Sequence, residues 1–275
     1  MDSLEYYGKI YSLPKKYQNK FKYTYVPLAS KGTRNNLLYF SARDKNNRSH
    51  IFKAEFNNQF KIKNKLVKFL SPKKNTDYCD GAIPLAKEKN HFYIACWKNL
   101  KNQKLRYKVS TAYFNIKKKK IYYLKLGSES LVTGYSKINE KKFLFTKSND
   151  KILNDRNIPV YSLNIAIKNK KKIKIKKLLN YKKKSILGYG RAINYKVKNK
   201  YHIIVPVRNW RGKYDKIKYL ITSDFNSFKI KNIECKKIKI TEFAHPSLLN
   251  IKRKKYIFFN NDLKGSKGIH LIKIK

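Results

Sequence analysis

The sequence predicts an all-β protein, and two observations lead to that prediction. Short runs rich in Tyr, Ile, Phe and Val alternate with polar residues, a pattern typical of half-buried strands, whereas no 12-residue stretch has the apolar spacing of an amphipathic helix. An apolar-aromatic strand also recurs along the 275-residue chain at intervals of 50 to 58 residues, each time with further short strands beside it. Repeats of about 50 residues with four strands each predict a five-bladed β-propeller with four-stranded antiparallel blades.

The strands of each repeat can be placed in order. The first strand, expected to be innermost, covers 26–28, 83–85, 135–138, 191–193 and 245–248 in the five repeats. The second strand carries an aromatic marker, at Tyr39, Tyr93, Phe143, Tyr201 and Tyr256. The third strand is expected at 49–56, 106–114, 159–167, 217–225 and 268–274. A fourth, Lys-rich strand follows in the first four repeats, at 60–69, 118–126, 172–179 and 228–240.

The fifth repeat has three strands before the sequence ends. We expect the N-terminal segment 7–13 to supply its outer strand, so that residues 1–275 form a single closed domain. A β-sandwich with coincidental spacing is the alternative interpretation.

The charge balance is strongly basic, with 67 Lys and Arg against 16 Asp and Glu and a formal net charge of +51. Aromatic residues reach 14%, which excludes a disordered basic tail. Lys, Asn, Ile and Tyr share A/T-rich codons, so base composition can explain part of the Lys excess. The densest Lys runs fall on predicted outer strands, where Lys prevents edge-to-edge pairing. If the rest of the positive charge serves binding, the partner that it attracts is anionic.

Other sequence features exclude several kinds of protein. No 18-residue apolar run indicates a transmembrane helix, and the N-terminus lacks the pattern of a signal peptide, so we expect a cytoplasmic protein. We also expect a monomer. Cys79, Cys96 and Cys235 lack CxxC spacing and are interpreted as free or buried thiols. The five His residues are scattered, so neither a metal site nor a cofactor is predicted.

Candidate functional residues lie where the inner strands begin, because side chains from different blades converge there. Asp80 precedes the second inner strand, Arg191 the fourth, and Glu242 and His245 the fifth. Arg43 and Asp44 follow the second strand of the first repeat, and Trp97 and Trp210 follow the corresponding strands of the second and fourth repeats. Arg is rare in this chain, and its planar fork suits carboxylate or phosphate recognition.

Each candidate also has a structural interpretation. Asp44 begins a good turn sequence and can serve as its cap. His245 precedes Pro246 and can be a structural histidine, and the two Trp residues can be core or rim residues instead of sugar-stacking platforms.

A resemblance to a known family rests on the run Arg43-Asp44-Lys45-Asn46-Asn47-Arg48-Ser49 within residues 38–51. It continues through 7–10, Asp80-Gly81, 190–192, His245-Pro246, 259–261 (which includes Asn260) and 265–268. These segments resemble five-bladed propeller proteins related to glycoside hydrolase families 43, 32 and 68, and most closely a glycosidase-like group associated with surface-polysaccharide synthesis. The resemblance implies a carbohydrate substrate and a carboxylate in each of the first three blades. Here the second blade has Asp80, the first has Val26, and the third has Gly134 with only Glu129 upstream.

Three functions follow as hypotheses. The first is a glycoside hydrolase-like or glycosyl-transferring enzyme, with Asp80, Glu242 and Asp44 as catalytic carboxylates. In this hypothesis Arg43, Arg191, His245, Trp97, Trp210 and Asn260 bind the substrate, which is a surface polysaccharide or an anionic sugar. The second is a propeller that binds a glycan or phosphosugar without turnover. The third is a basic scaffold for nucleic acid or a membrane surface, although Lys spread around all outer edges argues against it.

Overall fold

The computed structural model describes residues 4–46, 48–63, 66–71, 81–99, 107–123, 132–155, 157–169, 172–180, 185–261 and 268–275. Within them almost every element is a strand. The exceptions are the short helix α1 (Lys15–Gln18) and a 3-10 turn over Cys235–Ile238. No helix in the described ranges is long and apolar enough to cross a membrane.

The strands form antiparallel groups that follow the predicted repeats. The first group contains β2 (Phe21–Lys31), β3 (Asn36–Asp44), β4 (Ser49–Phe56) and β5 (Val67–Leu70), paired in that order. The second contains β6 (Gly81–Glu88), β7 (His91–Asn99), β8 (Tyr107–Asn115) and β9 (Lys120–Tyr123). The third contains β10 (Val132–Lys137), β11 (Lys142–Leu153), β12 (Pro159–Asn169) and β13 (Lys172–Leu179).

The last two groups depart from this plan. In the fourth, the predicted first strand at 191–193 falls mostly on a break between β14 (Ile186–Tyr189) and β15 (Ile193–Val197), which both pair with β16 (Lys200–Asn209). The strands β17 (Lys216–Thr222) and β18 (Lys229–Glu234) follow. The fifth contains β19 (Ala244–Ile251), β20 (Lys254–Asn261) and β21 (Gly268–Ile274), and β1 (Leu4–Tyr11) pairs antiparallel with β21. The N-terminal strand therefore completes the last group, as predicted, although it begins three residues earlier than expected.

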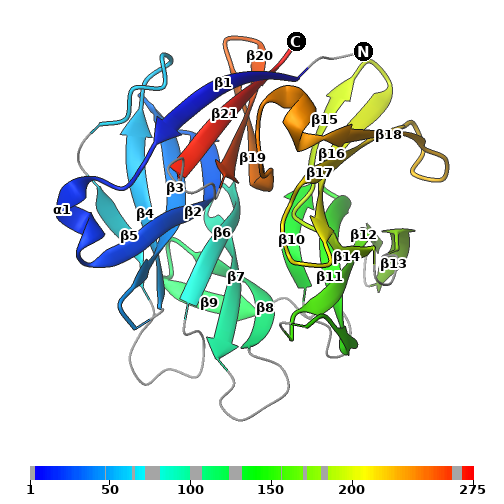
Figure 1. Cartoon of the computed structure of the whole chain (residues 1–275), viewed down its shortest axis with the longest axis horizontal. Coiled ribbons are helices and arrows are strands. Elements are labelled where there is room, and N and C mark those ends of the chain that lie inside the picture. Colours follow the sequence, from blue (N-terminus) through cyan, green and yellow to red (C-terminus); the bar gives the residue numbers. More distant parts are fainter. Residues whose placement is uncertain are drawn as a thin grey trace.

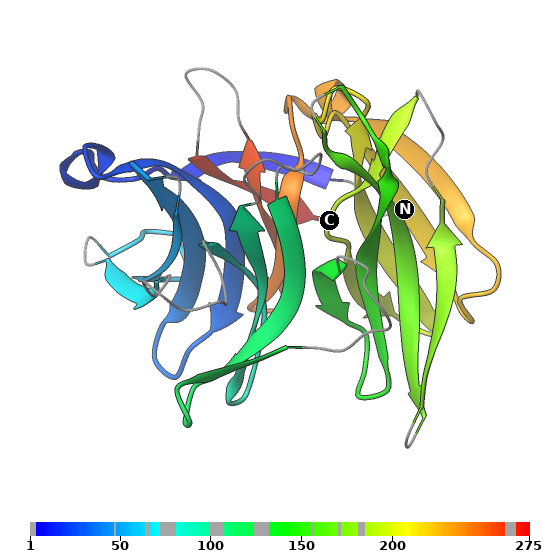
Figure 2. The same ribbon diagram turned by 90° about the horizontal axis from the view of Figure 1, so that it is seen from below.

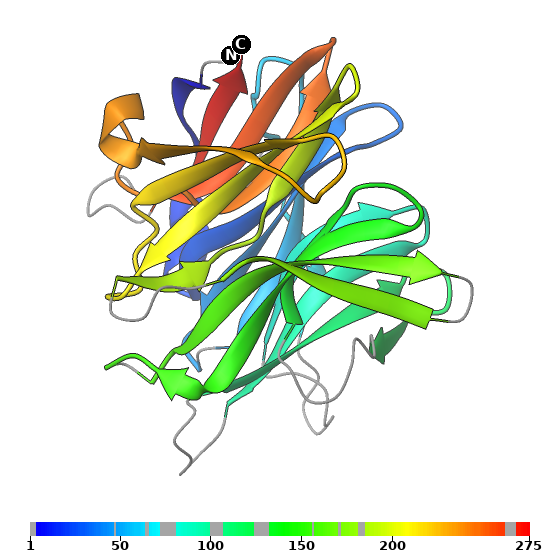
Figure 3. The same cartoon turned by 90° about the vertical axis from the view of Figure 1, so that its right-hand side faces the viewer.

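Figure 1 shows the groups following one another around the molecule in chain order, and the strands that carry the two termini lie side by side there and in Figure 3. In the view from below, the first and fourth groups lie on opposite sides (Figure 2). Single parallel pairs, Ser49 with Gly81 and Tyr161 with Gly188, link the first group to the second and the third to the fourth.

The apolar core lies between the faces of neighbouring groups. Phe40, Phe52 and Phe56 of the first group pack with Phe258 and Leu271 of the fifth. Similar clusters join the fourth group to the fifth and the third to the fourth. Face-to-face packing of this kind buries one side of each sheet against the next and leaves the outermost strand exposed.

The Lys-rich strands are outer edge strands, as predicted. Each of β5, β9, β13 and β18 pairs with a single neighbouring strand. On β13 and β18, exposed Lys residues alternate with exposed Ile173, Ile175 and Ile230. Lys at such edges blocks pairing with another chain.

The prediction that all cysteines are thiols is wrong. Cys96 is disulfide-bonded, and Cys235 is a buried free thiol. The third cysteine, Cys79, lies outside the described residues. The Cys spacing does not reveal this bond, because pairing depends on how strands are brought together in space.

Candidate functional site

The predicted site residues that the structure describes lie at the same end of their strand groups. Inner strands begin at this end, and the turns between second and third strands return to it because the strands are antiparallel. We call it the mouth end. Its members from the sequence prediction are Arg43, Asp44, Trp97, Arg191, Trp210, Glu242, His245 and Asn260.

Arg191 lies in the gap between β14 and β15 and is buried, with 4% of its surface exposed. Its Nη2 atom donates hydrogen bonds of 2.7 Å to the carbonyl oxygens of Pro27 and His245. Nη1 donates to the carbonyls of Pro84 at 2.7 Å and Leu85 at 3.3 Å, and Nε donates to Pro246 at 2.9 Å. All five N–H donors of the guanidinium are thus used, and the acceptors come from the first, second and fifth groups.

The carbonyl groups that Arg191 bonds lie at or next to three prolines of the inner strands. Pro27, Pro84 and Pro246 each lie at a register shift in an inner strand, which marks a β-bulge or irregularity. Val26 and His245, the residues before two of them, have positive φ angles of 53° and 52°. A bulge re-aims backbone groups and accommodates a proline that cannot donate to the ladder. The inner strands are therefore irregular where they meet Arg191.

Neighbouring glycines leave room for this arrangement. A Cβ atom on Gly134, which has φ of 69°, would lie 2.9 Å from the Cα atom of Arg191. A Cβ on Gly190 would lie 2.7 Å from a ring carbon of Tyr214. Both contacts are too close for any residue with a side chain, so these glycines allow the third and fourth groups to approach the centre.

This geometry changes the interpretation of Arg191. Burial lowers the pKa of its guanidinium to about 9. Main-chain carbonyls surround it and take every donor, so no N–H remains to hold an anionic ligand. Arg191 is a positioning residue that ties inner strands together, and the break in the strand at 190–192 lets its side chain reach the centre.

A second mouth-end cluster lies beside it, where the β16–β17 turn meets the start of β19. The Oε1 atom of Glu242 accepts a hydrogen bond of 3.2 Å from the main-chain N–H of Tyr214. The guanidinium of Arg208 lies 5.3 Å from the centre of the Tyr214 ring, and the His245 ring contacts the same tyrosine edge-on at 5.5 Å. Arg208, Tyr214, Glu242 and His245 form what we call the mouth cluster.

His245 is held neutral. Burial, followed by the positive charges of Arg191 and Arg208, lowers the pKa of its imidazole to about 3. A neutral ring at physiological pH can accept or donate a hydrogen bond but brings no charge. The predicted role of His245 in holding an anion by charge does not fit this environment.

Asp44 serves as a turn cap. Its Oδ1 accepts hydrogen bonds from the main-chain N–H groups of Asn46 at 2.9 Å and Arg48 at 2.8 Å, and its Oδ2 lies 3.0 Å from Nε2 of His50. Hydrogen bonds from His50 and from the turn hold the pKa of Asp44 below its usual value, although burial opposes them. Asp44 is therefore an ionised structural carboxylate here, which disfavours its predicted catalytic role.

The remaining predicted residues are dispersed or lie outside the description. Trp210 follows β16, and its carbonyl accepts a hydrogen bond from Asn154 at 2.8 Å. Asn260 is buried and pairs with Ala244 across β20 and β19. The backbone of Trp97 pairs with Gly81, and Arg43 pairs with Ser49. Asp80 lies outside the described residues, so its partnership with Glu242 stays a prediction.

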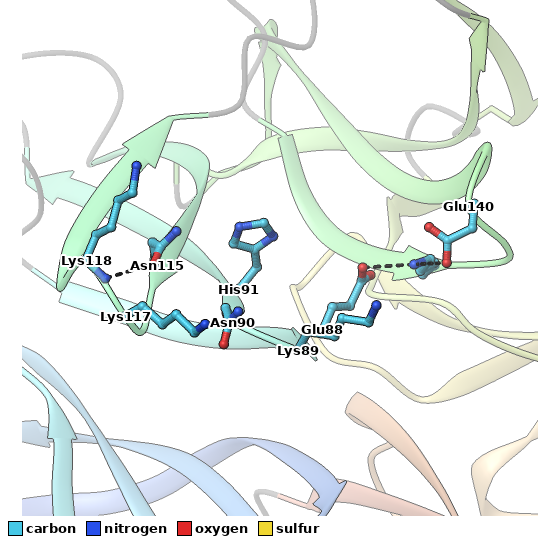
Figure 4. Close-up of a pocket in the computed structure, with 9 residues that line it drawn as sticks. Glu88, Lys89, Asn90, His91, Asn115, Lys117, Lys118 and Glu140 are labelled. Carbon is cyan, nitrogen blue, oxygen red and sulfur yellow. Dashed lines mark hydrogen bonds and ion pairs between the residues drawn. The ribbon is translucent and has the colours of Figure 1, made fainter.

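At the opposite end the structure has a pocket of about 510 Å³ that the sequence did not predict (Figure 4). Three hairpin turns build it, β6–β7, β8–β9 and β10–β11. Its lining consists of Glu88, Lys89, Asn90, His91, Asn115, Lys117, Lys118, Lys137 and Glu140.

Two carboxylates of this pocket flank one lysine. The Nζ atom of Lys137 lies 3.0 Å from Oε2 of Glu88 and 2.8 Å from Oε1 of Glu140, so these two oxygens lie within about 6 Å of each other. Paired carboxylates of retaining glycosidases are about 5–5.5 Å apart, so this upper limit permits such a separation and excludes the wider spacing of inverting enzymes. The charges of this pair differ from those of a glycosidase acid. Contact with Lys137 lowers the pKa of Glu140, and contact with Glu140 raises the pKa of Lys137. A general acid needs a raised carboxyl pKa, so this pair favours binding and disfavours proton donation.

The sequence offered a weak signal for this pocket. Glu88 and Glu140 are two of only 16 acidic residues. Glu88 ends the inner strand β6, and Glu140 lies in the turn after the inner strand β10. They are 52 positions apart, so only the packing of the second group against the third shows that they meet. No set of three or more His, Cys, Asp or Glu side chains within the described ranges could hold a metal ion.

Comparison with known proteins places the fold. No protein-family model matches the sequence, and no curated protein matches it. Solved structures do match, among them glycoside hydrolases of families 62, 43 and 130, which have five-bladed propeller folds. The chain shares their propeller-like all-β fold.

Three of these structures illustrate the likeness. An α-L-arabinofuranosidase of Podospora anserina, solved with cellotriose, superposes with a TM-score of 0.63 at 7% identity, over 100% of this chain and 97% of the other. An endo-arabinase of Bacteroides thetaiotaomicron gives 0.60 at 11% identity, over 91% and 94%. An α-L-arabinofuranosidase of Lactobacillus brevis gives 0.59 at 11% identity, over 91% and 90%.

Proposed function

We propose that this chain is a carbohydrate-active five-bladed propeller that binds an anionic glycan, such as a surface polysaccharide, at its mouth end. The observation that carries the proposal is the mouth cluster, in which a carboxylate, an arginine and an aromatic ring lie together on a fold shared with glycoside hydrolases. Sugar hydroxyls donate to carboxylates, and sugar rings stack on aromatic side chains. The Nε atom of Arg208 donates to the Gly212 carbonyl at 3.0 Å, and the positive charge of the guanidinium favours an acidic substituent nearby.

Contacts between successive inner strands support closure into five blades. Glu88 of β6 meets Tyr135 and Lys137 of β10, and Asn194 of β15 donates to Ser136 at 3.0 Å. Arg191 then joins the fourth group to the fifth, and the Ala29 N–H donates to Ser247 Oγ at 3.0 Å, which joins the fifth to the first.

Hydrolysis or glycosyl transfer is the second candidate function. The shared fold favours it, and a glycosidase needs two carboxylates on either side of the scissile bond. Glu242 supplies one, and the mouth-end prediction for the other is Asp80. Binding without turnover needs only residues that the structure describes, whereas turnover also needs Asp80.

Binding to an array of neutral and acidic oligosaccharides tests the proposal. Glu242→Gln keeps an oxygen for the Tyr214 N–H but removes the charge, and we expect it to weaken binding at least tenfold. Glu234→Gln is the matched control, because Glu234 lies on β18 and pairs with Lys216 at 3.2 Å. Unchanged binding in Glu242→Gln, or no binding to any glycan, overturns the proposal.

The same proteins test turnover. Release of reducing ends that disappears in both Asp80→Asn and Glu242→Gln establishes a hydrolase. Binding without release, at any pH between 4 and 9, establishes the binding function.

The predicted monomeric state is part of the proposal, and the cytoplasmic location stays a prediction. The Cys96 disulfide counts against the cytoplasm, because disulfides persist mainly in oxidising compartments.

A further inference from the structure

We propose that the pocket between the β6–β7, β8–β9 and β10–β11 turns is a second ligand site, which binds a sugar unit carrying an acidic substituent. The sugar part of this ligand rests on the proposed carbohydrate function. The acidic part rests on the charges of the pocket alone. The site is separate from the mouth end, because these turns lie at the opposite ends of the strands.

One wall of the pocket is cationic. Lys117 and Lys118 are exposed in the β8–β9 turn, and neither ammonium group has an ion-pair partner among the residues described. The main-chain N–H of Lys118 donates to Oδ1 of Asn115 at 2.9 Å, which fixes the turn and leaves the Lys118 side chain directed away from it (Figure 4). Figure 4 shows the Lys117 side chain running toward Asn90 and the Lys118 side chain running away from the turn, so the two ammonium groups lie apart along this wall. Each can attract a carboxylate, phosphate or sulfate.

The opposite wall carries two carboxylates, Glu88 and Glu140, which share the ammonium group of Lys137. Glu88 is 24% exposed and is held by both Lys137 and the Tyr135 hydroxyl, which donates to it at 3.2 Å. Stacking of Tyr135 on Tyr93, with ring centres 4.4 Å apart, fixes that hydroxyl in turn. A carboxylate held in place by such contacts still accepts hydrogen bonds from sugar hydroxyls through its remaining lone pairs.

His91 lies between the two walls (Figure 4). Its ring packs on Tyr113 with centres 4.7 Å apart, so its orientation is set by the β7–β8 pairing below the pocket. Asn90 lies beside it in the same turn and adds an amide. Both side chains suit hydroxyl groups of a ring lying across the pocket.

The two walls together select the ligand class. A uniformly anionic ligand, such as polyphosphate, would find on the other side a lysine, Lys137, that Glu88 and Glu140 already share. A neutral sugar would leave Lys117 and Lys118 without a counter-charge. A volume of about 510 Å³ is in the usual range for small-molecule sites and holds one or two sugar rings.

Isothermal titration with galacturonic acid, glucose 6-phosphate and galactose 6-sulfate tests the inference and distinguishes the three acidic groups. Galactose and inorganic phosphate are the neutral and sugar-free probes. We expect at least one acidic sugar to bind ten times more tightly than either probe. The double variant Lys117→Ala/Lys118→Ala should weaken that binding at least tenfold.

A matched control separates the site from the general field of a +51 chain. Lys252→Ala/Lys254→Ala removes the same charge from the exposed β19–β20 turn, at the same end of the molecule, and should change affinity less than twofold. Equal losses in both double variants, or phosphate binding as tightly as every acidic sugar, overturn the inference. The variant Glu242→Gln distinguishes the second site from the proposed function. If Glu242→Gln loses glycan binding while Lys117→Ala/Lys118→Ala keeps the affinity of the wild type for acidic sugars, only the second site is contradicted.

Discussion

The Nη2 atom of Arg191 donates a hydrogen bond of 2.7 Å to the carbonyl oxygen of Pro27, a residue 164 positions earlier in the chain. The same guanidinium bonds carbonyls of the second and fifth groups, so one side chain connects strands from most of the sequence. Removing it would leave several buried carbonyl oxygens without donors.

Arg191→Met should therefore lower the free energy of unfolding substantially. Leaving a buried polar group unsatisfied costs about 1–3 kcal/mol, and several are involved, so a loss of at least about 3 kcal/mol is expected. Urea unfolding followed by Trp fluorescence measures it. Arg211→Met is the control, because Arg211 is exposed. A loss below about 1 kcal/mol, comparable to ordinary surface substitutions, contradicts the central role of Arg191.

Ser247→Ala tests the contact between the first and fifth groups. It removes the acceptor of the buried Ala29 N–H, so we expect a loss of about 1–2 kcal/mol in stability. Ser30→Ala, at an exposed hydroxyl one residue further along β2, should change stability by less than about 0.5 kcal/mol. Equal effects from the two substitutions would show that this contact adds nothing to stability.

His245 makes stability depend on acid pH. Its folded pKa of about 3 lies below the value of 6.5 for an unperturbed histidine, so the unfolded chain binds more protons between these limits. The contribution is fully present above about pH 6.5 and is lost as the pH falls toward 3, at up to about 1.4 kcal/mol per pH unit.

Two measurements check this pH dependence. In urea unfolding across that range, His245→Gln should lose stability less steeply with acid than the wild type. NMR titration of the His245 ring should give a midpoint well below pH 5, and a midpoint near 6.5 would contradict the buried environment.

The thiols give a chemical test. Burial, followed by the charges of Asp215, Glu234 and Glu242, raises the pKa of Cys235 to about 12, so the native protein should react very slowly with a disulfide reagent at pH 8. In denaturant without reductant, one thiol should react, and after reduction all three cysteines should react. Three reactive thiols before reduction would rule out the Cys96 disulfide.

Much of the fold could be predicted because the alternation of apolar and polar residues within a strand shows which of its faces is buried. The bounds of β4, β13 and β21 match the predicted segments, since alternation is strong there and turns flank them. The break between β14 and β15 could not be predicted. It exists because Arg191 must reach carbonyls that lie 54 to 164 positions away, and no local pattern encodes those partners.

The site was predicted less well, for the same reason. The position of Glu242 and His245 within their repeat predicts that they lie at the mouth end, where the structure has them. The same reasoning could not show that Asp44 caps a turn, or that main-chain carbonyls take every N–H donor of Arg191. Glu88 and Lys137 were missed because their contact joins two hairpins, and each turn alone has an ordinary sequence.

The pairing of β1 with β21 has a consequence for how the protein forms during synthesis. Leu4 pairs with Ile274, so β1 has no partner until β21 has left the ribosome, 270 residues later in the chain. Arg191 likewise emerges long after the carbonyls of Pro27 and Pro84 that it will bond. Contacts of such long sequence separation slow folding, and an unpaired strand edge exposed meanwhile promotes aggregation. Recombinant production should therefore depend on translation speed and on chaperones that shield β1 until β21 has been synthesised.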